Sequence, residues 1–294
     1  IKIVALVKNN KRLKSFLELI VLVLLVVLSL YFIDKIPALD FPKPESTVGK
    51  VTMFTGIFLI ALLMLGLHEL GHLLTGLAQG FRFAIFVVGP LGVKREEEKI
   101  KWYFNTNLGH FGGIAATTPI NIDPANAQKF ARVIIAGPLT SLLGGIVLVG
   151  LSTLLDTPWN IIIFTGGLVS LMLFLATTIP SKTGPFFTDR KRYQRLTRPG
   201  KAQQVELATL RIMGQYAQDE SYQNVDPADI NILLEDEEPF MRYSGWFNKL
   251  YQQLEQDIEP PAEDWDSFRK TGKLLSKSMV TAMEKELEKA RKQG

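Results

Sequence analysis

Four long runs of apolar residues alternate with polar segments along the chain, and they set its predicted architecture. Each run is long enough for a helix that crosses the hydrocarbon core of a bilayer, which takes about 20 residues. The runs span residues 16–33, 51–77, 127–155 and 159–179. No small-residue cleavage site follows the first run, so we expect an uncleaved anchor helix there rather than a signal peptide.

Between the second and third runs, the spacing of apolar residues changes from the helical period to the alternating period of a strand. Residues 81–104 are rich in aromatic and β-branched side chains, with turn-forming residues at 89–92, which predicts a β-hairpin or small sheet. Glycines at 109, 112 and 113 then predict an irregular loop that reaches Pro119.

From about residue 199 the sequence reads as a soluble helical segment. Apolar residues recur at helical spacing, and the aromatic stripe at 240–254 is expected to form a core rather than a binding surface. We therefore predict a mainly α polytopic membrane protein with about four transmembrane helices, a small β-hairpin insert and a C-terminal soluble helical domain. Its predicted parts are an anchor helix and external linker at 1–50, a membrane core at 51–198 and a cytoplasmic helical domain at 199–294.

The composition agrees with a membrane part joined to a soluble part. The 294 residues are 47% hydrophobic and 21% charged, with a mean hydropathy of +0.15. The net charge of +4 is small and gives no indication of a nucleic-acid partner. Cysteine is absent, which excludes disulfides and leaves His, Asp and Glu as the ligands for any metal ion.

The distribution of Lys and Arg predicts the orientation in the membrane. Five lie in residues 1–15 and seven in residues 182–201, against three in residues 34–50 and none in residues 156–158. Cytoplasmic flanks of membrane helices carry the excess of Lys and Arg. A multi-pass protein of the cell membrane with both termini in the cytoplasm is therefore expected.

The second apolar run contains His68-Glu69-Leu70-Gly71-His72, an H-E-x-x-H pattern. In a helix, His68 and His72 lie one turn apart on one face and can bind the same metal ion. Glu69 is rotated by about 100°, beside the metal, where it can accept a proton from metal-bound water. The alternative is a polar patch that faces a neighbouring helix, with both histidines merely hydrogen-bonded.

Catalytic zinc usually has three protein ligands, so a third is needed. The candidates are His110, Asp123, Asp156 and Asp189. A membrane span separates Asp156 from the motif. Asp123, which precedes Pro124, is explained as a helix N-cap. His110 lies in the glycine-rich loop, and Asp189 follows a helix end broken by proline and glycine on the side of the membrane where the motif lies.

Over residues 51–195 the chain resembles the site-2 protease family of intramembrane zinc metalloproteases. The resemblance rests on the H-E-L-G-H motif, the aromatic hairpin, Gly-Gly-Ile-Ala-Ala-Thr-Thr-Pro at 112–119, Ala-Gly-Pro-Leu at 136–139 and a late Asp. It implies one Zn²⁺ per chain, with His68, His72 and Asp189 as ligands and Glu69 as the catalytic base. Two features depart from the family: Arg190 follows the Asp where Gly is common, and Ser181 and Thr183 occupy the region that often carries an Asn.

The predicted function is that of a zinc metalloendopeptidase that hydrolyses peptide bonds of membrane-spanning protein substrates in the lipid bilayer, in regulated intramembrane proteolysis. Two alternatives remain. One is a catalytically inactive relative that acts as a membrane scaffold or substrate-binding protein, and the other is a different zinc-dependent membrane hydrolase. The hairpin at 81–104 either holds a substrate as an added strand or anchors the protein at the membrane surface. The C-terminal helical domain is a candidate for binding a protein partner.

Overall fold

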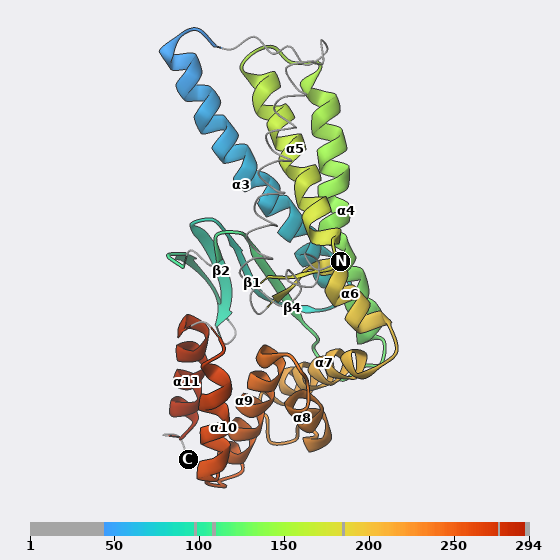
Figure 1. The fold of residues 1–294 in the computed structure, drawn as a ribbon, viewed down its shortest axis with the longest axis vertical. Helices are drawn as coiled ribbons and strands as arrows, with labels where there is room; N and C mark the ends of the chain where they lie inside the picture. Colours follow the sequence, from blue (N-terminus) through green and yellow to red (C-terminus); the bar gives the residue numbers. More distant parts are fainter. Residues whose placement is uncertain (1–43, 97–98, 108–109, 184–185, 276, 292–294) are drawn as a thin grey trace, which may run out of the picture.

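A computed structural model describes residues 44–96, 99–107, 110–183, 186–275 and 277–291. Its upper part in Figure 1 consists of long apolar helices, with a β-sheet and a short helix at their lower ends and a group of shorter helices below. The predicted anchor helix at 16–33 lies outside the described residues.

Within the described part of the chain, three helices are long and apolar enough to cross a membrane. They are α3 (Thr47–Ala78), α4 (Asn126–Ser152) and α5 (Trp159–Thr178). They confirm the helices predicted for the second, third and fourth apolar runs, and their ends differ from the predicted ends by a few residues.

The three long helices pack through a small apolar core and expose apolar side chains outward. Ile60 and Met64 of α3 are buried against Ile162 of α5. Phe54 and Phe58, on other faces of α3, are exposed, as expected for side chains that contact lipid. The membrane part therefore has an internal apolar seam as well as an apolar exterior.

The predicted small sheet is present and has four antiparallel strands in the order β3-β2-β1-β4. The strands are β1 (Arg82–Val88), β2 (Leu91–Glu96), β3 (Lys99–Phe104) and β4 (Ile114–Thr118). The prediction of an irregular loop up to Pro119 was wrong for residues 114–118, which pair with β1. Gly76 of α3 makes room for this strand, because a Cβ at that position would overlap the side chain of Thr117.

The predicted N-cap at Asp123 was also wrong. Helix α4 begins at Asn126, and the side chain of Asp123 accepts a hydrogen bond of 2.8 Å from the backbone N–H of Ala125. The other carboxylate oxygen lies 2.8 Å from Nζ of Lys129. Asp123 thus closes a turn just before the helix, because an aspartate side chain can bond the backbone two residues on.

A short segment connects the membrane helices to the C-terminal helices. It contains the two-residue strands β5 (Lys182–Thr183) and β6 (Phe186–Phe187) and the helix α6 (Asp189–Thr197). The C-terminal helices are α7 (Lys201–Asp219), α8 (Pro227–Leu234), α9 (Pro239–Glu255), α10 (Ala262–Gly272) and α11 (Lys277–Arg291). Tyr243 and Leu250 of α9 are fully buried with Phe268 and Leu287, which confirms the aromatic stripe as core.

Candidate metal centre

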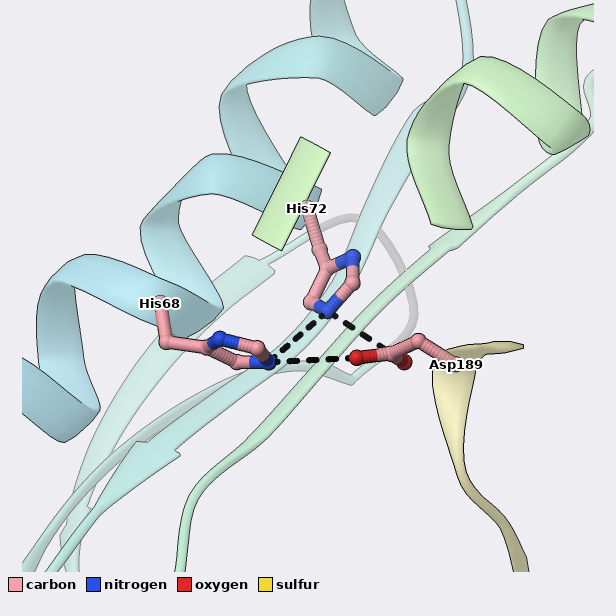
Figure 2. A group of neighbouring side chains, drawn as sticks. All are labelled: His68, His72 and Asp189. Carbon is pink, nitrogen blue, oxygen red and sulfur yellow. Dashed lines mark hydrogen bonds and ion pairs between the residues drawn. The ribbon is translucent and has the colours of Figure 1, made fainter. Parts of the chain in front are cut away.

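The H-E-x-x-H residues lie in the lower half of α3, next to the sheet. His68 is buried, and the Nε2 atoms of His68 and His72 are 3.3 Å apart. Both rings direct Nε2 toward the same point (Figure 2). The helical spacing of the motif therefore produces the pair of convergent nitrogen atoms that it predicts.

Asp189, the first residue of α6, meets both histidines. Its Oδ2 lies 3.3 Å from Nε2 of His68, and its Oδ1 lies 3.6 Å from Nε2 of His72 (Figure 2). Among the described residues, these three form the group whose ligand atoms all lie within 4.8 Å of one another. The fold thus joins the late Asp to the motif and leaves the other three candidates out of the group.

Hydrogen bonds behind the two imidazoles set their orientation. Nδ1 of His72 donates to the carbonyl oxygen of Val133 in α4, at 2.8 Å, so in the neutral ring Nε2 carries a lone pair. Nδ1 of His68 shares a hydrogen bond of 2.9 Å with Oγ of Ser141. Ser170 of α5 donates to the carbonyl of Ser141 at 2.7 Å. Partners of this kind orient metal-ligating histidines.

The spacing of the three side chains fits a zinc ion. Two ligands about 2.1 Å from a tetrahedral zinc are roughly 3.4 Å apart, and the observed separations are 3.3, 3.3 and 3.6 Å. Oδ2 of Asp189 is buried and has no hydrogen-bond partner, which a cation would supply. Burial raises the pKa of Asp189, but the neighbouring His68 and His72 outweigh burial and lower the pKa to about 2. Asp189 is therefore a carboxylate at neutral pH.

Glu69 points to another side of α3, toward the start of β4. Its carboxylate accepts a hydrogen bond from the backbone N–H of Ala115. Gly113 has a φ of +100°, and a Cβ there would lie 2.8 Å from both Cγ and Oε1 of Glu69. Glycine is needed at this position for its backbone conformation and for the close approach of the carboxylate.

Helix α4 covers the motif closely because both helices carry a glycine at the contact. A Cβ on Gly137 would overlap the ring of His72, and a Cβ on Gly71 would overlap the side chain of Thr140. Small residues at helix contacts allow such close packing in membranes. The Ala-Gly-Pro-Leu stretch at 136–139 therefore lies directly against the candidate metal centre.

The remaining candidates for the third ligand lie elsewhere. Nε2 of His110 is 3.2 Å from Nδ2 of Asn107, and Asp123 is paired in the turn before α4. Asp156 lies beyond the far end of α4. Val133 of this helix contacts His72, and Ser152 at the end of the helix is 19 residues further on, roughly 28 Å along its axis. Arg190 is exposed, with its guanidinium carbon 5.9 Å from the centroid of the Tyr193 ring.

Several residues around the centre had no distinct signal in the sequence. Nothing in the local sequence identifies Ser141 as a partner of His68 or the carbonyl of Val133 as a partner of His72. The sequence predicts Gly113 as a loop residue but does not predict its contact with Glu69. Each of these contacts joins residues more than 40 positions apart, so local periodicity does not reveal them.

Comparison with known protein families gives one match. The family model described as Peptidase family M50 matches residues 56–291. No curated protein and no solved structure matches the chain. The match includes most of α3 with its motif, the sheet, Asp189 and helices α7–α11. It therefore continues well beyond residue 195, where the sequence resemblance ended.

Proposed function

The chain belongs to peptidase family M50, the site-2 protease family, and from this premise we propose that it is an active intramembrane zinc metalloprotease. The proposal rests on the convergence of His68, His72 and Asp189 at one point beside Glu69. The two histidines and Glu69 belong to a helix long and apolar enough to span a membrane, and Asp189 reaches them from α6. In the proposed site the three converging residues hold one Zn²⁺ per chain, and Glu69 is the catalytic base.

The chain supplies the proton acceptor and the orientation of the site. A bound Zn²⁺ lowers the pKa of coordinated water to about 7 and polarises a carbonyl group. Glu69 accepts the proton of the attacking water at a carboxylate oxygen, while the N–H of Ala115 holds that carboxylate in place. Val133 and Ser141 keep the two imidazoles turned toward the centre.

The sequence left two alternative roles for the hairpin at 81–104, and we assign them to opposite edges of the sheet, one of which is β4, outside the hairpin. Strand β4 forms the edge next to Glu69 and pairs with β1 on its other side. A substrate segment unwound from its helix can add to this edge as an extended strand, which brings a peptide bond toward the centre. Strand β3 is the opposite edge, where Trp102 and Phe104 are 78% and 71% exposed, and these aromatic side chains suit a membrane surface.

The proposed substrates are membrane-spanning proteins, and the proposed process is regulated intramembrane proteolysis. The alternative of an inactive scaffold was motivated in part by Arg190 beside the third ligand. That side chain extends toward Tyr193 and is exposed, so it leaves the approach of Asp189 to the histidines open. The geometry therefore supports an active enzyme over a scaffold.

We expect the purified full-length protein in lipid vesicles to cut a synthetic transmembrane substrate in a metal-dependent way. Incubation with a strong zinc chelator should abolish cleavage, and added Zn²⁺ should restore it, because His68, His72 and Asp189 are the proposed ligands. Product formation is followed by mass spectrometry, with a chelator already saturated with zinc as the control. Cleavage that continues at full rate in protein shown to be free of metal would exclude the proposed mechanism.

We also expect α3, α4 and α5 to lie in the cell membrane with both termini of the chain in the cytoplasm, as the Lys and Arg distribution indicates. Reporter fusions placed after residues 45, 100 and 200 should read outside, inside and inside. An outside signal at 200 together with an inside signal at 100 would place Asp189 across the bilayer from the motif and contradict this topology.

A further inference from the structure

Helix α6, which begins with Asp189, is attached to the C-terminal helices through a buried arginine. Arg195 is 8% exposed, and its Nε donates to Oε1 of Glu206 in α7 at 2.8 Å. Its Nη2 donates to Oδ2 of Asp236, in the turn between α8 and α9, also at 2.8 Å. Arginine keeps its charge when buried and presents donors in a rigid fork, so two carboxylates fix the position of the guanidinium group.

The same arginine also holds the strand that precedes Asp189. Its guanidinium carbon lies 4.5 Å from the centroid of the Phe187 ring in β6. Earlier in this segment, Lys182 forms an ion pair with Glu238, two residues beyond Asp236. Both flanks of Asp189 are thus tied to the short acidic segment 236–238.

Local sequence alone does not determine where α6 points. The helix has nine residues, and helices of that length are marginal without tertiary contacts. Leu196 packs against Ile134 of α4 and Leu210 of α7, which fixes the end of α6 opposite Asp189. The direction of α6 therefore depends on this apolar contact and on the ion pairs of Arg195.

We propose that Arg195 and Asp236 are positioning residues for the third ligand, so that the C-terminal helices complete the metal centre from outside the membrane. The inference rests on the proposed function, because it takes Asp189 as a ligand. Asp236 touches neither metal nor substrate and acts through Arg195, which sets the direction from which Asp189 approaches His68 and His72.

The test compares two ion pairs of the same region in the full-length protein, each with an aspartate side chain that is largely buried. Asp236→Asn keeps the shape of the side chain and removes its charge. Asp229→Asn is the matched control, because Asp229 of α8 is buried and paired with Arg211 of α7. That pair joins α7 to α8 within the C-terminal helices. Zinc affinity is measured by competition with a chromophoric chelator, and folding is measured by thermal unfolding.

We expect Asp236→Asn to weaken zinc binding about tenfold, the lower end of the range for partners that orient metal ligands. It should also change the visible absorption of the Co²⁺-loaded protein, which reports the ligand geometry. Asp229→Asn should lower the unfolding temperature to a similar extent and leave zinc affinity and the Co²⁺ spectrum unchanged. Arg195→Lys, which retains the charge and cannot form both hydrogen bonds in the same geometry, should fall between the wild type and Asp236→Asn.

Wild-type zinc affinity in folded Asp236→Asn would overturn the inference. An equal loss of zinc affinity in Asp236→Asn and Asp229→Asn would also overturn it. Should Asp236→Asn fail to fold, wild-type affinity in Arg195→Lys has the same meaning. His68→Ala is measured in the same assay as a reference. Unchanged zinc binding in that variant would place the error in the proposed metal centre itself and not in the role of Asp236.

Discussion

Replacing Glu69 by glutamine should abolish proteolysis while the protein retains its zinc. The amide has nearly the shape of the carboxylate, and its oxygen can still accept the hydrogen bond from the N–H of Ala115. It cannot take a proton from water at neutral pH, and a positioned general base contributes about 10²- to 10⁴-fold to the rate. Turnover of a synthetic transmembrane substrate and zinc content by elemental analysis measure the two effects separately.

Two further variants separate loss of the base from loss of the site. Glu96→Gln changes an exposed glutamate on β2 that pairs with Lys94 and Lys101, and it should keep both zinc and activity. His68→Ala should lose zinc and activity together. If Glu69→Gln loses as much zinc as His68→Ala, Glu69 is a ligand or a structural residue, and the assignment of the base is wrong.

Removal of the carboxylate at Asp189 should empty the metal centre. Asp189→Ala leaves His68 and His72 as the remaining proposed ligands, and a catalytic zinc site usually needs three. Zinc occupancy and cleavage should both fall to near background, while the three described membrane helices stay assembled, because the side chain of Asp189 contributes little to their apolar packing. Elemental analysis, cleavage assays and helix content by circular dichroism measure these outcomes.

Two further changes serve as controls for Asp189→Ala. Arg190→Gly should retain zinc and retain or raise turnover, because the exposed arginine faces Tyr193. Asp123→Ala removes another candidate ligand, which is paired with Lys129, and should leave zinc in place. Full zinc and full cleavage in Asp189→Ala would show that the third ligand lies elsewhere, with His110 the next residue to replace.

The sequence predicted best where structure depends on neighbours within a few positions. Apolar runs long enough to span a bilayer give α3, α4 and α5, since such a segment in lipid must satisfy its backbone internally as a helix. The pairing of His68 with His72 follows from one helical turn. The aromatic stripe around Tyr243 was predicted as core for the same reason, because helical spacing puts those residues on one face.

The sequence predicted less where the structure depends on distant partners. Strand β4 is a short segment next to glycines, and its pairing with β1 and its fit beside Gly76 identify it as a strand. Asp123 has the residue type of an N-cap, but its bonds to Ala125 and Lys129 form a turn before the helix begins. The contacts of Arg195 with Glu206 and Asp236 span 11 and 41 positions and leave no local pattern.

Asp189 lies between these two cases. The side of the membrane on which it lies and the broken helix before it kept it among four candidates, and the family resemblance implied it as the ligand. The structure brings it next to His68 and His72. Whether it binds the metal remains a prediction for the experiments above.

The distance along the chain between the proposed ligands bears on how the protein is made. His72 and Asp189 are 117 positions apart (189 − 72), and α4 and α5 lie between them. At a translation rate of about 5 to 20 residues per second, the motif helix exists for on the order of ten seconds before Asp189 leaves the ribosome. Asp236 follows 47 residues later still (236 − 189). If these residues are the ligands, as proposed, the metal centre stays incomplete until α4 and α5 have been synthesised.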